Sequence, residues 1–480
     1  MNGALATIGP YGIAVGAVLL IKLLLSIPLP HRQRRTAGPE FRERDEDLTL
    51  HAIVTAHNEP LAMLRRCLKS FLDQTRPPLS VTVVDDASGN RDGTPNHDAA
   101  HVCRELASAY RWAGVELHYV RHPQNRGKRE GLATGFRKHW TADLYVCVDS
   151  DTVLEPAALE EAVRPFSRRR VHCVTGLVLA HNRAVNLLTR LIDMRYVNAF
   201  LGERVAYGRL GSVLCACGSL VVYRGWVVRK HLPDFLGQRF LGRPATFGDD
   251  RRLTYYCLIE GQSLINPRAV ARTDVPKSLG HYVRQQIRWG KSFIREGVLL
   301  AAQFRHARRA FWWLNLLELA MWGVFTTALI AALVLLVTHP AGPAILGAYA
   351  AYVCVMSWLR SVHYLRGAAS VPLGDRWATF ACAPLYALLN LSLLLPLRLY
   401  SLATLRDNGW GTRTAGAEDT GHTTGEPLAA PVRPTTPANE DERPTLAIPS
   451  PRHEDTVPLV KLRDPDSETT LQVAQPLRTR

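Results

Sequence analysis

Residues 144–151 read Leu144-Tyr-Val-Cys-Val-Asp149-Ser-Asp151, a short apolar run that ends in two acidic residues. The runs His51-Ala-Ile-Val-Thr-Ala56 and Val81-Thr-Val-Val-Asp-Asp86 have a similar form. Helix-like stretches separate these runs, and this alternation predicts an α/β domain with a largely parallel sheet over residues 48–275. Ligands of such sheets gather at the carboxyl ends of the strands. The acidic residues are therefore expected at a ligand site.

An apolar run precedes this domain. Residues 8–29 are long enough to cross a bilayer and carry one lysine, Lys22. No basic residue precedes the run, whereas His31-Arg-Gln-Arg-Arg35 follows it. This order is the reverse of a secretory signal, so residues 1–35 are predicted to form an uncleaved membrane anchor. The positive-inside rule places the C-terminal side of the anchor in the cytoplasm.

Further membrane segments are expected after the α/β domain. Residues 276–309 are typical of amphipathic helices at a membrane surface. Spans are predicted near residues 310–337 and 344–365, because both runs are apolar and of suitable length. The short connection between them lacks Lys and Arg, which places it outside and the α/β domain inside.

The C-terminal part is less uniform. The stretch 377–405 contains Pro384 and Pro396 and is compatible with one span or with a re-entrant hairpin. We assign 310–413 as a whole to a membrane region. Residues 414–480 are rich in Pro, Thr, Glu and Asp, so they are predicted to be disordered.

The net charge of +16 indicates an anionic partner. Lipid headgroups and phosphorylated substrates fit this charge. No zinc-finger spacing, RNA-binding motif or basic heptad helix is present, so we expect no nucleic-acid partner. The nine cysteines show no zinc spacing and no disulfide framework, which fits a reducing compartment.

The acidic clusters suggest chemistry on a diphosphate. Two carboxylates in an Asp-x-Asp motif at a strand end are suited to hold a hard divalent cation, Mg²⁺ or Mn²⁺, although an isolated motif is more often structural. Asp249 and Asp250 either cap a helix or supply a base that takes a hydroxyl proton. Downstream, Arg288 and Trp289 provide a cation and a flat apolar surface side by side.

Taken together, the motifs resemble those of the processive family 2 glycosyltransferases, which include cellulose, chitin and hyaluronan synthases. The motifs that carry the resemblance are Val54-Thr-Ala-His-Asn-Glu59, Val84-Asp-Asp-Ala-Ser88, Asn125-Arg-Gly-Lys-Arg129, Asp149-Ser-Asp151, Gly248-Asp-Asp-Arg251 and Gln285-x-x-Arg-Trp289. The resemblance implies a GT-A-like fold inserted between transmembrane helices, with interface helices and a channel. Three further stretches are similar to hyaluronan synthases: Leu220-Val-Val-Tyr-Arg224, Phe240-Leu-Gly-Arg-Pro244 and Trp410-Gly-Thr-Arg413.

The resemblance also implies roles for single residues. Asp250 is expected to be the general base, supported by Asp249, while Asp149 and Asp151 bind the metal and diphosphate. The residues expected to bind substrates are Asn58 and Glu59 in the first loop, Asp86 at the uridine, Lys128 and Arg129 near the donor, Gln285, Arg288 and Trp289 at the acceptor and pyrophosphate, and Trp410 and Arg413 over the nucleotide.

The implied activity is inverting, metal-dependent polymerisation of UDP-N-acetylglucosamine and UDP-glucuronate, with extrusion of the polysaccharide by a multi-pass protein of the plasma membrane. One departure affects the choice of sugars: Cys217-Gly218-Ser219 stands where hyaluronan synthases usually have Ser-Gly-Pro. Three alternatives remain open. They are a chitin or chito-oligosaccharide synthase with one donor, a transferase to a lipid phosphate, and an inactive UDP-sugar sensor.

Overall fold

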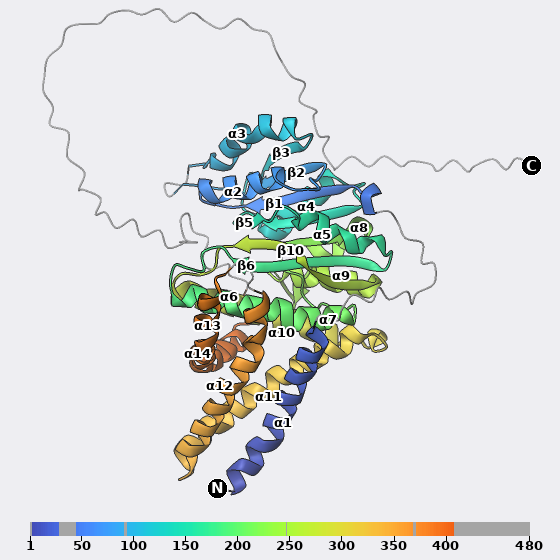
Figure 1. Ribbon diagram of the computed structural model, residues 1–480. Helices are drawn as coiled ribbons and strands as arrows, with labels where there is room; N and C mark the ends of the chain where they lie inside the picture. Colours follow the sequence, from blue (N-terminus) through green and yellow to red (C-terminus); the bar gives the residue numbers. More distant parts are fainter. Residues whose placement is uncertain (1, 28–44, 91–93, 246, 368–370, 408–480) are drawn as a thin grey trace, which may run out of the picture. The chain divides into compact units, whose positions relative to one another are not determined.

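The computed structural model describes residues 2–27, 45–90, 94–245, 247–367 and 371–407. All of these residues lie in one compact unit. Its centre is a sheet of eight strands in the order β3-β2-β1-β4-β7-β6-β10-β5 (Figure 1). The strands are β1 Leu50–Ala56, β2 Ser80–Asp85, β3 Glu116–Arg121, β4 Leu144–Asp149, β5 Thr152–Leu154, β6 Val171–Ala180, β7 Val221–Arg224 and β10 Gln262–Thr273.

Strand direction divides the sheet. The strands β1 to β4 are mutually parallel, and β6 and β10 are parallel to each other. β7 runs antiparallel to β4 and β6, and β5 runs antiparallel to β10. The result is a mixed α/β sheet, in agreement with the predicted α/β class. A separate small hairpin is formed by β8 Arg239–Phe240 and β9 Arg243–Pro244.

Helices cover both faces of the sheet. Alternate residues of a strand point to opposite faces, and the apolar side chains of β1 follow this rule. Ala52 and Val54 pack in the core beneath the first group of helices, and Ile53 packs beneath the second. The first group is α2 Leu61–Leu72, α3 Asp98–Trp112 and α5 Ala158–Val163; the second is α4 Lys128–Lys138, α8 Gly225–Leu236 and α9 Asp249–Glu260.

A long helical segment lies between this sandwich and the apolar helices (Figure 1). It begins with α6 Leu187–Val197, continues through a π-helical stretch over Asn198–Arg204, and ends with α7 Val205–Arg209. The amphipathic helix α10 Leu279–Ala301 accompanies it. π-Helical turns inside α-helices are often found at functional sites, because the extra residue redirects the side chains that follow.

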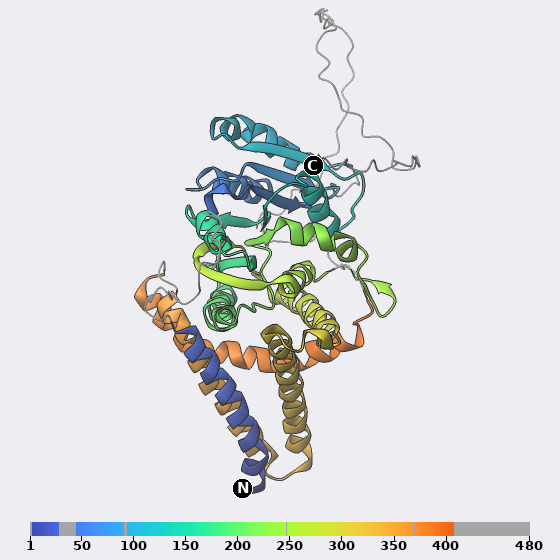
Figure 2. The same ribbon diagram turned by 90° about the vertical axis from the view of Figure 1, so that its right-hand side faces the viewer.

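Apolar helices make up the remainder of the described chain. They are α1 Asn2–Ser26, α11 Ala310–Thr338, α12 Gly342–Gly367, α13 Leu373–Ala381 and α14 Ala383–Ala403. Among the described residues, α11 and α12 are each long and apolar enough to cross a membrane, and the α13–α14 region adds a third candidate that is bent by 42°. Figure 2 shows α14, in orange, running crosswise to α11 and α12. This bend agrees with a broken or re-entrant segment.

Gly176 marks an irregular point in the sheet. The pairing of β6 with β10 shifts register between Ile265 and Val270, opposite this glycine. The chain of β10 folds over Gly176 there, so that a Cβ atom would overlap the carbonyl oxygen of Ala269 and lie 2.6 Å from Leu220 Cδ2. No larger residue fits without a shift of the backbone.

Gly176→Ala is therefore expected to destabilise the folded protein by about 1–3 kcal/mol, the usual cost of overpacking. The measurement is the thermal unfolding midpoint of purified protein in detergent. Gly347→Ala is the matched control, because a Cβ atom at Gly347 meets nothing within 4 Å. Equal midpoints for the two variants would contradict the packing described here.

Candidate active site

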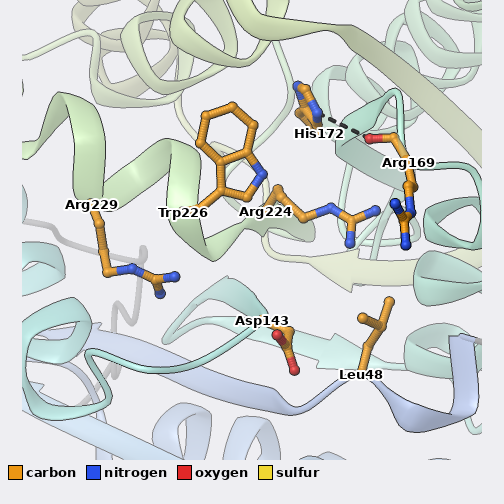
Figure 3. Close-up of a pocket in the computed structure, with 7 residues that line it drawn as sticks. All are labelled: Leu48, Asp143, Arg169, His172, Arg224, Trp226 and Arg229. Carbon is orange, nitrogen blue, oxygen red and sulfur yellow. Dashed lines mark hydrogen bonds between the residues drawn. The ribbon is translucent and has the colours of Figure 1, made fainter. Parts of the chain in front are cut away.

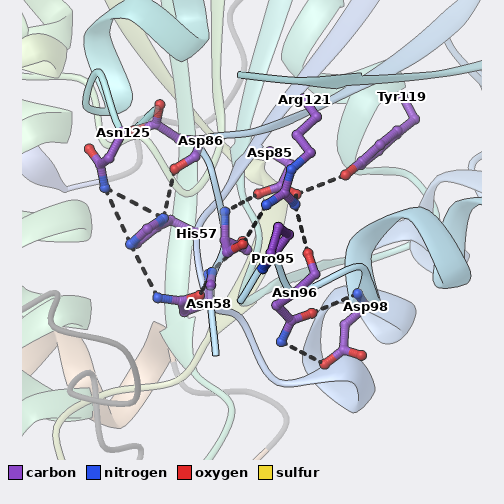
Figure 4. Close-up of polar contacts among 12 residues, drawn as sticks. His57, Asn58, Asp85, Asp86, Pro95, Asn96, Asp98, Tyr119, Arg121 and Asn125 are labelled. Carbon is purple, nitrogen blue, oxygen red and sulfur yellow. Dashed lines mark hydrogen bonds and ion pairs between the residues drawn. The ribbon is translucent and has the colours of Figure 1, made fainter. Parts of the chain in front are cut away.

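The carboxyl ends of the neighbouring strands β1, β2 and β4 carry the first residues of the site. Asp85, at the end of β2, is fully buried. Its carboxylate accepts hydrogen bonds from Arg121 Nη1 at 2.6 Å, Tyr119 Oη at 2.8 Å and the Ser88 amide at 2.9 Å (Figure 4). All of these contacts are internal to the fold. Asp85 therefore fixes the loop that presents Asp86.

Asp86 shapes the opening of α4. Its carboxylate accepts hydrogen bonds from the backbone amides of Arg126 at 2.8 Å and Gly127 at 2.7 Å. His122 Nδ1 lies 2.8 Å from Asp86 Oδ1. The backbone oxygen of Asp86 accepts a hydrogen bond from the ring of His57 (Figure 4). With 4% exposure, Asp86 has the loop before α4 as its main partner. Its contact with a uridine stays a prediction.

Asn58 and Glu59 form the loop after β1. Asn58 has a positive φ of 54°, which Asn tolerates better than most residues. Its Oδ1 accepts from the Gly89 amide at 2.8 Å, and its own amide donates to Ser88 Oγ at 2.9 Å. Glu59 lies close enough to Asp151 to raise the pKa of that carboxyl group. The predicted first loop therefore lies beside the Asp-x-Asp motif.

Lys128 is the central cation of the site. It is the first residue of α4, after Gly127 with φ 85°, and its Nζ donates to Asp149 Oδ1. Burial alone would lower the pKa of Lys128. The carboxylates of Asp149 and Asp250 outweigh burial and raise that pKa well above its ordinary value. Lys128 thus stays charged and connects the β4 end with the start of α9.

The carboxylates around Lys128 are crowded. Burial, followed by the charges of Asp149 and Glu59, raises the pKa of Asp151 to about 8. Asp151 Oδ1 accepts from Thr273 Oγ1 at 2.9 Å, a bond that partly opposes the shift. Burial also raises the pKa of Asp250 to about 6, with Asp149 adding to the shift and Lys128 opposing it. The charge of Asp149 therefore acts on both Asp151 and Asp250.

The segment that departs from the hyaluronan synthase pattern forms one wall of this volume. The Gly218 amide donates to Asp250 Oδ2 at 3.0 Å. A Cβ atom at Gly218 would lie 2.8 Å from Asp250 Oδ1 and 2.9 Å from Lys128 Nζ, so a larger residue would displace these side-chain ends. Ser219 Oγ donates to Asp149 Oδ2 at 3.3 Å, a bond that proline cannot make. The departure therefore touches a proposed metal ligand directly.

Asp249 and Arg129 have a structural role in addition to their place at the site. Arg129 Nε donates to Asp249 Oδ1 at 2.7 Å, and both side chains are buried. The Arg129 guanidinium also lies 5.3 Å from the centre of the Phe235 ring of α8. This ion pair joins α4 to α9, both of which begin at the site. The pair thus fixes the first residue of α9, next to Asp250, and the supporting role of Asp249 in catalysis stays a prediction.

The α10 residues lie on the side of the site toward the apolar helices. The Trp289 ring is 41% exposed and lies 6.3 Å from the ring of Tyr196. The Arg195 guanidinium lies 5.3 Å from the Trp289 ring and donates to Gln286 Oε1 at 3.0 Å. Gln285 Oε1 is buried without a hydrogen-bond partner, and Arg288 is partly buried. Two aromatic rings and one cation thus face a common space.

Tyr196 connects this surface with the carboxylates. Burial and the neighbouring Cys217 and Asp151 raise the pKa of the Tyr196 hydroxyl. The Tyr196 hydroxyl thus lies near the Asp-x-Asp motif, and its ring lies beside that of Trp289. Sequence reasoning missed Tyr196 and Arg195, because both lie in a helix without a recognised motif. Trp410 and Arg413 lie outside the described residues.

A divalent metal ion fits the two carboxylates of Asp149 and Asp151. In the described part of the chain, no group of three or more His, Cys, Asp or Glu side chains is arranged to hold a metal ion. Asp149 and Asp151 offer carboxylate oxygens, and the charge of Asp149 helps to raise the pKa of Asp151. Two hard oxygen ligands that leave positions for a substrate are typical of Mg²⁺ and Mn²⁺ sites at phosphates.

Comparison with known proteins supports a common architecture. Residues 49–292 match the family described as "Glycosyltransferase like family 2", a range that includes every strand of the sheet. The chain is 35% identical over 415 residues to a hyaluronan synthase of Streptococcus pyogenes, covering 85% of this chain and 91% of that protein. N-acetylglucosaminyltransferases of Azorhizobium caulinodans (35% over 363 residues; 75% and 86% coverage) and Mesorhizobium japonicum (34% over 378 residues; 78% and 84% coverage) are also similar.

Asp151→Asn is expected to raise the thermal midpoint of the metal-free protein by a few degrees at pH 8. Because the pKa of Asp151 is raised, the folded state holds the proton more tightly than the unfolded state does. The contribution of Asp151 to stability therefore falls as pH rises from its ordinary pKa of 3.8 to about 8. Scanning fluorimetry in EDTA should show a larger gain at pH 8 than at pH 5.

Asp73→Asn is the control for this measurement, since it removes an exposed carboxylate outside the site. It should leave the midpoint unchanged at both pH values. A gain for Asp151→Asn that is equal at pH 5 and pH 8 would exclude the crowding of carboxylates as its cause.

Proposed function

We propose that this chain is a hyaluronan-type synthase. It belongs to family 2 of the glycosyltransferases and is a processive transferase bound to a membrane. It adds sugars alternately from UDP-N-acetylglucosamine and UDP-glucuronate to a growing polysaccharide. It extrudes the product through its own helices, as a multi-pass protein of the plasma membrane with the catalytic domain in the cytoplasm.

The transfer step is assigned to Asp250. In an inverting transfer, the acceptor hydroxyl attacks the anomeric carbon of the donor, the bond to the diphosphate breaks, and a base takes the hydroxyl proton. Asp250 lies at the start of α9 beside Lys128 and has a pKa of about 6, which suits a base near neutral pH. The Gly218 amide and Lys128 orient its carboxylate.

The binding of the UDP-sugar donor is assigned to the charged residues Lys128, Asp149 and Asp151. Lys128 is buried, charged and bonded to Asp149, so it is placed to contact a diphosphate. Asp149 and Asp151 would hold Mg²⁺ or Mn²⁺, which would neutralise the charge of the departing UDP. Asp86 orders the Arg126–Gly127 turn that precedes Lys128, next to the expected uridine position.

The acceptor end is assigned to the aromatic surface. Sugars stack on exposed aromatic rings through their apolar faces, and Trp289 provides such a ring, with the half-buried ring of Tyr196 beside it. Arg195 lies over the Trp289 ring and adds a positive charge at this place. A glucuronate carboxylate is the acceptor group that this arginine would recognise.

The proposal of an acidic product rests on a cluster of charged residues around Glu203. Burial would raise the pKa of Glu203, but four surrounding cations hold it at about 2. The cations come from four different elements and are Arg360, Lys22, Arg204 and Arg195. Two carboxylates pair with these cations. Glu203 pairs with Arg360, and Glu318 pairs with Lys22 at 2.7 Å.

This cluster lies where α1, the π-helical segment and α12 contact one another. Four cations against two carboxylates leave an excess of positive charge between the acceptor surface and the apolar helices. A neutral chitin chain needs no such charge, whereas a chain with a carboxylate on every second sugar is attracted by it. The charge balance therefore favours the product with two sugars.

The single-donor alternative has its own support. The similar proteins of Azorhizobium and Mesorhizobium are named N-acetylglucosaminyltransferases, and their identity to this chain equals that of the streptococcal synthase within 1%. Such an enzyme would build a chito-oligosaccharide from one donor with the same catalytic residues. The Cys217-Gly218-Ser219 segment is a place where the two specificities would differ.

A donor-combination assay decides between these functions. Purified protein is incubated with each UDP-sugar alone and with both, and polymer is measured by size-exclusion chromatography and hyaluronidase digestion. We expect polymer only when UDP-N-acetylglucosamine and UDP-glucuronate are both present. Polymer from UDP-N-acetylglucosamine alone would establish the single-donor function, and product extracted into organic solvent would indicate a lipid acceptor.

Asp250→Asn is expected to lower the rate of transfer about 10²- to 10⁴-fold, the usual contribution of a general base. UDP affinity should stay within about threefold of wild type, because Lys128 and Asp149 remain. In the wild type, kcat/KM should fall as pH drops below about 6, since protonated Asp250 accepts no proton. Transfer within tenfold of wild type, measured beside Asp73→Asn, would remove Asp250 from this role.

A further inference from the structure

Arg224 and Arg295 are buried arginines that each contact a carbonyl oxygen and an aromatic ring. Arg224 is 6% exposed, ends β7 and lines the cavity drawn in Figure 3. Its Nη2 donates to the Phe166 carbonyl at 2.9 Å, and its guanidinium lies 5.3 Å from the centre of the Phe166 ring. In the sheet it pairs with Leu144, at the end of β4 away from Asp149. Arg224 therefore has a structural position outside the candidate active site.

Arg295 lies at a different place, in the second half of α10, and is 2% exposed. Its Nε donates to the carbonyl oxygen of Leu405 at 2.9 Å, and its Nη2 donates to that of Asp407 at 3.2 Å. Both carbonyls lie just beyond α14, which ends at Ala403. Arginine side chains near the carboxyl end of a helix often satisfy its free carbonyl oxygens. The guanidinium therefore holds the chain at the point where it leaves α14.

The same guanidinium also contacts the turn before α9. It lies 4.4 Å from the centre of the Phe247 ring. Phe247 directly precedes Gly248, whose φ of 98° opens α9 and presents Asp250. A planar guanidinium can stack on a ring while its N–H groups donate in the plane of the group. Arg295 thus links two segments that are far apart in the sequence.

Neighbouring residues of α10 contact the same two segments, and α10 packs against both α9 and α14. Ser292 lies against Gly248, where a Cβ atom would be 2.8 Å from the serine Oγ. Lys291 Nζ lies 5.9 Å from the centre of the Tyr400 ring of α14. Arg295 differs from these two neighbours because its own side chain contacts both segments.

The burial of Arg295 is unfavourable for folding. Its Nη1 is buried and has no hydrogen-bond partner in the described part of the chain. A buried donor that is left unpaired costs stability. Replacing a buried charge by an apolar side chain of similar volume is often neutral or stabilising. Stability alone therefore gives little reason for an arginine at this position.

We propose that Arg295 is a positioning residue for sugar transfer, which fixes the chain beyond α14 relative to the turn that carries Asp250. Trp410 and Arg413, which are predicted to bind over the nucleotide, follow Asp407 by three and six residues in the sequence. Arg295 therefore aligns the segment expected at the nucleotide with the expected base. This inference rests on the proposed role of Asp250, but not on which sugars are polymerised.

Arg295→Met tests the proposal, because methionine fills much of the volume and donates no hydrogen bond. Full-length protein in detergent is assayed for kcat with the UDP-sugars that the wild type polymerises, and for its thermal midpoint. We expect kcat to fall about 10- to 100-fold, since a misplacement of about 1 Å at reacting groups has a cost of this size. The midpoint should equal that of the wild type or rise, because an apolar side chain replaces a buried charge.

Arg224→Met is the matched control, since it removes a buried arginine with the same kinds of contact outside the site. Each protein is assayed at the same interval below its own thermal midpoint. Arg224→Met should then keep kcat within about twofold of wild type, a negligible change in activation free energy. If Arg295→Met also keeps kcat within that range, Arg295 has only a structural role and the proposal is overturned.

Two further variants show how Arg295 acts. Arg295→Lys keeps the charge and a donor but not the planar group, so its kcat should lie between those of Arg295→Met and wild type. In a Phe247→Leu background, Arg295→Met should cost less than about threefold, because the ring that couples it to the base turn is absent. Equal losses in both backgrounds would overturn the proposed coupling.

A failure of the proposed function is recognised separately. If Asp250→Asn keeps transfer, the base assignment is wrong whatever Arg295→Met does. If the wild type makes polymer from one donor, the choice of sugars is wrong. The Arg295 and Arg224 variants are then compared with that donor, and the same limits apply.

Discussion

The repulsion of Asp149 against Asp151 and against Asp250 is the constraint on which the rest of the structure depends. Burial and the charge of Asp149 raise the pKa values of Asp151 and Asp250, and Lys128 is the cation that offsets the charges of Asp149 and Asp250. Each carboxylate comes from a different part of the chain, at β4, just beyond β4, and at α9. The sheet order and the Arg129–Asp249 pair are needed to keep these segments in place.

The loop 217–219 shows how closely the surroundings fit this group. A side chain at Gly218 would displace the ends of Asp250 and Lys128, and Ser219 donates to Asp149. A substitution in this loop therefore acts on the carboxylates without changing any of them. The ring of Trp289 lies beside that of Tyr196, whose hydroxyl is close enough to Cys217 and Asp151 for them to raise its pKa.

Strands with acidic ends were predictable from the sequence, because alternating apolar runs and Asp pairs are local patterns. The gathering of Asp149, Asp151, Asp250 and Lys128 was also predictable, through the family motifs. Arg195 and Tyr196 were not, since their position depends on how α6 meets α10 and α12. Nor was the role of Asp85, which shares a motif with Asp86 but points into the core. Pairing of β5 with β10 rests on contacts between distant residues.

That pairing has a consequence for biogenesis. The edge strand β5 finds its partner only in β10, which ends at Thr273. During synthesis, α1 leaves the ribosome first and is available to the membrane long before the sheet can close. After β5 is made, about 120 more residues must therefore emerge before the sheet is complete. Such a long separation is typical of slow, long-range β assembly. Chaperone protection at the membrane surface would be most useful in this interval.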